Sequence, residues 1–213
     1  MFGFVKRITV LSLLISLGTF LKDILALLVI DHRFLGLVAA APTIHRRQSA
    51  CFLVGKTALP AEVSSGVSAL ASQVTCGTKT IANTGGVPDV TSAGISFSSI
   101  DFQSSRKSPI GFALDTFKTP ADPATANLAT LQNQLNTYLA MEAGVRSTGS
   151  NMLGQLKGTK FFLQFQIARV RTAQGAKLGA ADTVEHQLGK VLKNAVGATQ
   201  AEKDAVTALS KQL

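Results

Sequence analysis

The stretch that decides the fold is DPATANLATLQNQLNTYLAMEAGVR, residues 122–146. Its large apolar side chains advance by three, four and three residues: Leu128, Leu131, Leu135 and Tyr138. That spacing places them on one face of an α-helix. Asp122 is a suitable N-cap, and Pro123 suits the first turn. The sequence therefore predicts a long helix that packs this face against a core.

The same apolar face carries one carboxylate. Continuing the spacing leads to Glu142 and then to Val145. A lone buried carboxylate is costly, so a cationic partner is expected. Arg146, four residues on, is one candidate, and Arg169 or Arg171 from a neighbouring helix are the others. We predict a structural ion pair; a catalytic acid and simple exposure are the alternatives.

A second long segment, KFFLQFQIARVRTAQG at 160–175, fits two interpretations. Its apolar residues alternate with glutamines, which is typical of a strand, while its length and flanking glycines also suit a helix. We favour a helix packed against the first one. It would carry Phe161, Phe162 and Phe165 into the core.

Three further helices are predicted. The segment 59–76, LPAEVSSGVSALASQVTC, has apolar residues at steps of four, three and four, with Cys76 at its end. The segments 182–195 and 199–213 each open with capping-box spacing. The two boxes pair Asp182 with Glu185 and Thr199 with Glu202.

Residues 77–120 are rich in glycine, serine, threonine and proline and predict mostly loop. Within them, apolar and polar residues alternate in AGISFSSIDFQ at 93–103, with a one-residue slip between Phe97 and Ile100. This pattern predicts one or two short strands with a bulge.

The N-terminus is typical of a secretory signal. Lys6 and Arg7 precede an apolar run, and small residues permit cleavage before Ala41, so residues 1–41 form the leader. Residues 18–34, which carry several charges, make it longer than a signal needs. A membrane anchor over residues 8–30 is the alternative and would be the only membrane contact.

A dibasic pair follows in TIHRRQSAC, residues 43–51. Arg46 and Arg47 predict processing, with 42–47 as a short pro-segment and 48–213 as a single secreted domain. Two solvated arginines in an unstructured tail are the alternative.

Both cysteines, Cys51 and Cys76, fall in the predicted mature chain. An even pair in a secreted protein predicts a disulfide, and two free buried thiols are the alternative. The expected fold class is therefore mainly α: a disulfide-stapled, helical bundle-like domain with a short β/loop insertion. An α+β fold is the alternative.

The mature chain is only mildly basic. The whole sequence has 21 basic and 12 acidic residues, and residues 1–47 hold six and two of them, which leaves 15 − 10 = +5. Basic and aromatic residues are not interleaved in a way that would provide stacking platforms, so no nucleic-acid partner is expected.

The motifs of common catalytic and cofactor sites are missing from the sequence. There is no G-x-S-x-G, G-x-G-x-x-G or G-x-x-x-x-G-K-[ST]. His186, the only histidine after residue 48, directly follows Glu185, so the Glu-x-x-His spacing of di-metal bundles is missing as well. We predict no catalytic residue, no cofactor and no metal, and an exposed His186.

Several strings between residues 51 and 210 resemble a family of fungal small secreted proteins of unknown function. They are LPAEV, GVPDV, FSSIDF, SPIGFAL, NQLNTYLAMEAGVRS, KFFLQFQIARV and VLKNA. The resemblance implies extracellular delivery and a shared domain, but it implies no activity.

The leading functional hypothesis is a secreted, non-catalytic cell-surface or host-interaction module, with cell-wall or host-surface components as the partners considered. The alternative is a small helical protein that binds an apolar ligand or lipid between the phenylalanine-rich helices. A secreted hydrolase is the third possibility.

Overall fold

The computed structural model describes residues 50–213. The leader, its membrane-anchor alternative and the processing site at Arg46 and Arg47 lie outside the described residues and stay predictions.

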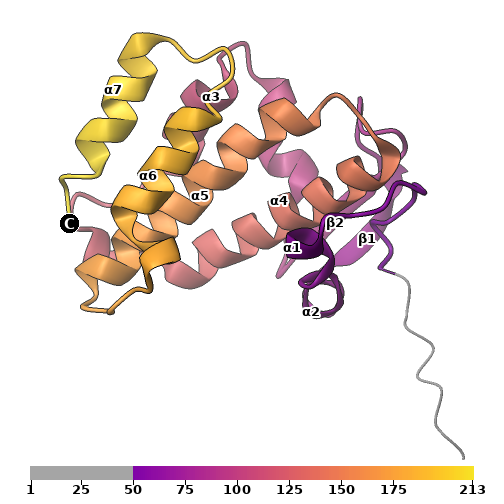
Figure 1. Cartoon of the computed structure of the whole chain (residues 1–213), viewed down its shortest axis with the longest axis horizontal. Coiled ribbons are helices and arrows are strands. Elements are labelled where there is room, and N and C mark those ends of the chain that lie inside the picture. The colour runs from indigo at the N-terminus through magenta and orange to yellow at the C-terminus, as the bar shows by residue number, and fades with distance from the viewer. Residues whose placement is uncertain (1–49) are drawn as a thin grey trace, which may run out of the picture. The chain divides into compact units, whose positions relative to one another are not determined.

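The described part of the chain is mainly helical, with a small three-stranded sheet, so the mainly α prediction is confirmed at this level (Figure 1). Two helices are much longer than the others. The elements, in chain order, are α1 (Ala61–Ser64), α2 (Val67–Ala71), β1 (Thr75–Thr80), β2 (Pro88–Ser92), β3 (Ile95–Ser96), α3 (Pro109–Thr116), α4 (Leu128–Thr148), α5 (Leu153–Ala173), α6 (Val184–Lys193) and α7 (Gln200–Leu209). Short 3₁₀ turns lie at Phe97–Ile100, Phe102–Ser104, Pro123–Thr125 and Ala180–Asp182.

The predicted long helix is α4, and its apolar face is buried. Leu131, Leu135 and Tyr138 are each 6% exposed or less. The predicted start was wrong, because Asp122 caps the 3₁₀ turn at Pro123–Thr125 instead. The α4 cap is Asn127, whose side chain accepts a hydrogen bond from the Thr130 backbone N–H at 3.0 Å. Ala126 and Asn127 are extended, and they separate the turn from the helix.

The ambiguous second segment is helical, as we favoured, and belongs to α5. This helix packs against α4 and also contacts α3 and α6. Phe162 and Phe165 are fully buried, whereas Phe161 is only partly buried. The α4–α5 pair therefore supplies much of the core.

The single helix predicted over 59–76 was wrong. The chain forms the short helices α1 and α2, and Cys76 lies in β1. Gly66 stands between the two helices, and glycine inside a helix is unfavourable. Ser64 and Ser65 also donate hydrogen bonds from their hydroxyls to carbonyls of the preceding turn, a bonding mode that competes with helix continuation.

The loop prediction for 77–120 missed most of the sheet and all of α3. The sheet is antiparallel in the order β1-β2-β3, with Cys76 opposite Val90 and Thr91 opposite Ser96. β1, TCGTKT, is almost entirely exposed, so it carries no apolar alternation to reveal it. The predicted strands at 93–103 are confirmed only at β3, because two 3₁₀ turns follow it. Helix α3 begins at Pro109, with Ser108 as its cap.

The two C-terminal helices, α6 and α7, are confirmed. The capping box of α7 forms as predicted, with Thr199 and Glu202 bonding each other's backbone N–H. The α6 cap lies one residue later than predicted. Thr183, rather than Asp182, accepts the hydrogen bond from the His186 backbone N–H.

Candidate functional site

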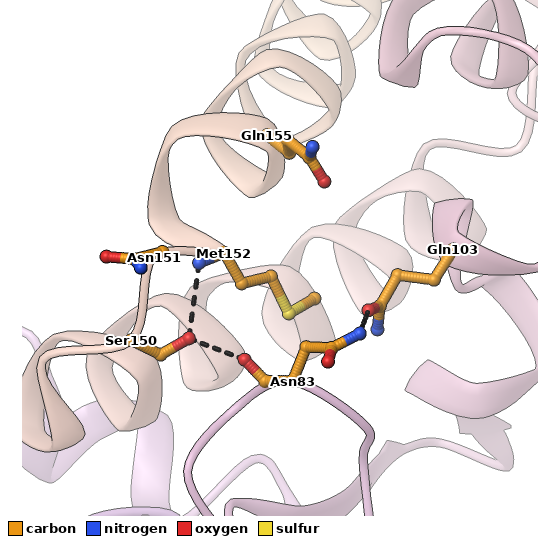
Figure 2. A pocket seen from close by; sticks show the side chains of 6 residues that line it. All are labelled: Asn83, Gln103, Ser150, Asn151, Met152 and Gln155. Atoms are coloured by element: carbon orange, nitrogen blue, oxygen red, sulfur yellow. Dashed lines mark hydrogen bonds between the residues drawn. The ribbon is translucent and has the colours of Figure 1, made fainter.

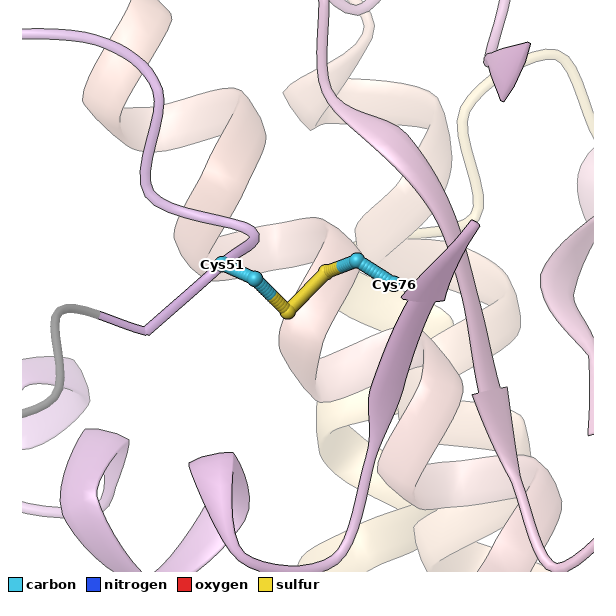
Figure 3. The surroundings of a disulfide bond; sticks show 2 residues. All are labelled: Cys51 and Cys76. Atoms are coloured by element: carbon cyan, nitrogen blue, oxygen red, sulfur yellow. A yellow bond between two sulfur atoms is a disulfide. The ribbon is translucent and has the colours of Figure 1, made fainter. Parts of the chain in front are cut away.

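The predicted disulfide is present. Cys51 and Cys76 are bonded with an S–S distance of 2.10 Å, and no cysteine in the described residues is free. The bond links the segment before α1 to strand β1 (Figure 3). It closes a loop of 25 residues that contains both short helices.

Glu142 is buried at 2% exposure and carries the predicted ion pair with Arg146. Its Oε1 accepts hydrogen bonds from Arg146 Nε at 3.2 Å and Nη2 at 2.9 Å. Its Oε2 accepts a third from Lys160 Nζ at 2.7 Å. Both carboxylate oxygens are therefore satisfied by cations, which is the arrangement of a structural cluster.

Lys160 is the partner that the sequence reasoning missed. It lies on α5 and is 7% exposed, and its ammonium group lies 4.1 Å from the centre of the Phe161 ring. Burial lowers the pKa of Lys160, and the nearby Glu142 carboxylate opposes that shift. Arg146 and Lys157 add to the lowering. Helix α5 begins earlier than predicted, at Leu153, and its packing against α4 brings Lys160 to Glu142.

The two arginines proposed as alternative partners do not reach Glu142. Arg169 is 1% exposed and donates to the Gln166 side chain, to Thr119 Oγ1 at 3.2 Å and to the Gln212 carbonyl at 2.8 Å. It therefore ties α5 to the C-terminal segment. Arg171 is exposed.

A polar cavity of about 430 Å³ lies where three distant segments meet (Figure 2). The segments are the β1–β2 loop, the 3₁₀ turn at Phe102–Ser104 and the connection from α4 into α5. The lining residues are Asn83, Gln103, Ser150, Asn151, Met152 and Gln155. We call this the amide pocket, because four of the six side chains are amides.

Hydrogen bonds hold the walls of the amide pocket together. Asn83 Nδ2 donates to Gln103 Oε1 at 2.8 Å, which joins the loop to the 3₁₀ turn. The Ser150 hydroxyl donates to the Asn83 carbonyl and accepts from the Met152 N–H at 3.2 Å. Asn83 has a positive φ of 60°, a conformation that asparagine tolerates better than most residues. The pocket is thus preformed by contacts within the protein.

Gln103 is itself oriented from behind by Asp101. The Gln103 backbone N–H donates to Asp101 Oδ1 at 2.9 Å, and its side-chain Nε2 donates to Asp101 Oδ2 at 3.1 Å. Burial raises the pKa of Asp101, while these hydrogen bonds oppose the rise. The carboxylate therefore directs the Gln103 carbonyl oxygen towards Asn83.

The chemistry available in the amide pocket is hydrogen bonding. Amides donate and accept hydrogen bonds but do not titrate in the range where general acids and bases work. The Ser150 hydroxyl is already engaged on both sides, by a carbonyl and a backbone N–H. Such a site can hold and orient a ligand.

A second, larger cavity of about 1000 Å³ lies beside the disulfide. Its apolar lining comes from the two bonded cysteines and from Ala50, Leu53, Val67, Ala71 and Val74. Thr75 and serines in or next to α1 and α2 line the rest. We call it the disulfide groove. Neither cavity is lined by a phenylalanine.

His186 is exposed, as predicted. Within residues 50–213, no group of three or more histidine, cysteine, aspartate or glutamate side chains is arranged to hold a metal ion. No helix in this described range is both long and apolar enough to cross a membrane.

The pocket residues escaped sequence reasoning because they lie far apart in the chain. The only local signal is ANTGG at 82–86, a turn-forming string that reveals a loop but not its neighbours. Gln103 and Gln155 show no pattern at all before the chain is folded.

No curated protein and no solved structure matches the chain. One protein family matches over residues 53–213, which is most of the sequence and nearly all of the described domain. The chain belongs to the family described as Domain of unknown function (DUF7143).

Proposed function

We propose that this protein is a secreted, non-catalytic binding protein that acts at a cell surface or in contact with a host. The active form is the domain 48–213, released by cleavage after Arg47. Its partners are components of cell walls or host surfaces. The resemblance to fungal small secreted proteins supports this delivery route.

The amide pocket is the observation that carries the proposal. It is preformed, its volume lies within the range of about 300–1,000 Å³ that small-molecule sites occupy, and its side chains are neutral. These groups suit recognition rather than bond cleavage, since none of them titrates as a general acid or base near neutral pH.

The disulfide supports an extracellular location. Disulfides form and persist in oxidising compartments and are rare where glutathione keeps thiols reduced. The Cys51–Cys76 bond is therefore consistent with passage through a secretory pathway.

The proposal is tested with the full chain, expressed with its own leader in a eukaryotic secretory host. Intact mass of the protein recovered from the medium should give a chain that starts near Gln48 and lacks two hydrogens at the cysteines. This protein should sediment with insoluble fungal or plant cell walls and should release no soluble sugar or acyl group from them. Product release, or retention of the protein inside the cells, would refute the proposal.

The disulfide groove favours a second candidate function, the binding of an apolar ligand or lipid. It is the larger of the two cavities, and five of its side chains are aliphatic. It differs in place from the site we predicted, since Phe162 and Phe165 are buried in the core. Native mass spectrometry of the secreted protein tests this candidate. A retained lipid that is lost in Val67→Asp supports it, and a ligand-free mass counts against it.

A further inference from the structure

We propose that the amide pocket binds a neutral, hydroxyl-rich ligand, namely one sugar unit of an uncharged polysaccharide. This inference rests on the proposed binding function and names its ligand class. Three observations support it: which side chains face the cavity, which of their hydrogen-bonding groups are already paired, and the position of the Asp101 carboxylate behind Gln103.

Two sets of amide groups remain available to a ligand. Within the described residues, Asn83 Oδ1 accepts no hydrogen bond, and the Gln155 side chain makes none. Figure 2 shows the Gln155 amide on one side of the cavity and the Asn83–Gln103 pair on the other. A sugar hydroxyl both donates and accepts, and so does an amide, so neighbouring hydroxyls can pair with these groups.

Met152 gives the pocket an apolar surface. Its side chain extends from the start of α5 into the space between Gln155 and the Asn83–Gln103 pair (Figure 2). It is 5% exposed, so it forms a fixed part of the wall. A pyranose ring carries C–H groups on its faces and hydroxyls at its edge. The mixed lining of thioether and amides matches both.

The charges argue against an ionic ligand. No lysine, arginine, aspartate or glutamate lines the cavity, so a charged ligand would lose water without gaining a counter-charge. The Asp101 carboxylate lies behind Gln103 and would repel an anion. Both of its oxygens already accept hydrogen bonds from Gln103, so they do not serve as partners for a cation. A purely apolar ligand would leave the amides unpaired.

The cavity opens to solvent, which favours a unit within a longer chain. One sugar can enter while the rest of the polymer remains outside. Affinity for a single pocket of this kind is expected to be weak, with repeated sugar units raising the apparent affinity.

The experiment uses the full-length secreted protein and three soluble hexasaccharides, built from glucose, mannose or N-acetylglucosamine. A galacturonic acid hexasaccharide serves as the charged comparison. Titration calorimetry and NMR shift mapping are run on the wild type, on Gln155→Ala and on Gln73→Ala. Gln73 is the matched control, because it is an exposed glutamine outside the cavity whose side chain makes no hydrogen bond to another described residue.

We expect at least one neutral hexasaccharide to bind with a Kd below about 1 mM and to bind more tightly than the charged one. Gln155→Ala should weaken binding about tenfold, which corresponds to one lost hydrogen bond to the ligand. Gln73→Ala should stay within about twofold of the wild type, since it loses no such bond. Both side chains are exposed, so neither change should affect folding.

The inference is overturned if none of the neutral hexasaccharides binds, if the charged one binds more tightly, or if Gln155→Ala binds like the wild type. Sedimentation with cell walls separates this failure from that of the proposed function. If Gln155→Ala sediments with cell walls as well as the wild type does, the protein binds walls through another site, and only the sugar-binding inference for the amide pocket is refuted. If the wild type itself fails to sediment with cell walls, both the sugar-binding inference and the proposed function are refuted.

Discussion

Replacing Glu142 with alanine tests whether the buried ion cluster stabilises the fold. The change removes three hydrogen bonds, two from Arg146 and one from Lys160. Arg146 can turn to water, because its side chain is already 15% exposed. Lys160 cannot do so easily, because its side chain is 9% exposed and packs over Phe161.

The expected cost follows from that difference. Removing one partner of a buried pair typically costs about 3–5 kcal/mol, because an uncompensated charge stays behind. For a domain of this size, that loss lowers Tm by roughly 6–20 °C. Glu62→Ala is the matched control, since Glu62 is an exposed glutamate on the short helix α1. It should change the unfolding free energy by about 0.5 kcal/mol or less.

The effect should also depend on pH. Burial already lowers the pKa of Lys160, and without Glu142 the remaining cations lower it further. A lysine with a lowered pKa destabilises the fold while it is charged, and the penalty is relieved as pH rises through its folded-state pKa. The stability difference between wild type and Glu142→Ala should therefore be larger at neutral pH than at about pH 9.

Chemical denaturation at both pH values measures these differences. A double variant, Glu142→Leu with Lys160→Met, should recover most of the lost stability, because it removes the stranded charge along with its partner. Glu142→Ala as stable as the wild type would refute the reasoning. An undiminished loss at high pH would refute the assignment of the cost to Lys160.

Reducing the bond between Cys51 and Cys76 should lower the unfolding free energy by about 3.5 kcal/mol, the loop-closure value for 25 residues. Titration of the protein before reduction should find no free thiol. Gly144→Ala should cost about 1–3 kcal/mol in denaturation, because its Cβ would lie 2.7 Å from a backbone oxygen of the segment before α1. Gly154→Ala on α5 is its control, since a Cβ there meets nothing within 4 Å; it should be neutral or stabilising by up to about 1 kcal/mol. Tyr138, the only tyrosine, is fully buried, and burial raises its pKa well above the ordinary value of 10.0. The contribution of the protonated Tyr138 to stability is fully present below pH 10.0 and is lost as pH rises through the folded-state pKa. Phenolate absorbance should therefore appear together with alkaline unfolding rather than before it.

Local patterns in the sequence were sufficient for most of the helices. The three-and-four spacing before Tyr138 identified α4, and the capping box at Thr199 and Glu202 identified α7. The pair Glu142–Arg146 was also predictable, because four residues is one helical turn. The even cysteine count was enough to predict the disulfide.

The predictions failed where local signals conflicted or were missing. The apolar spacing over 59–76 favoured one helix, but Gly66 and serines that bond back to the backbone divide it. Strand β1 is exposed along most of its length, so no alternation marks it, and only its pairing with β2 makes it a strand.

Only the tertiary structure decided which distant groups meet. Lys160 reaches Glu142 because α5 packs against α4, and its position in the sequence gives no sign of this contact. The amide pocket likewise joins Asn83, Gln103 and Gln155 from three separate segments. Helix periods, caps and turns are short-range properties of the chain and can be read from neighbouring residues. A pocket or a buried charge partner depends on how whole elements pack, and that packing is settled by the free energy of burying the entire core.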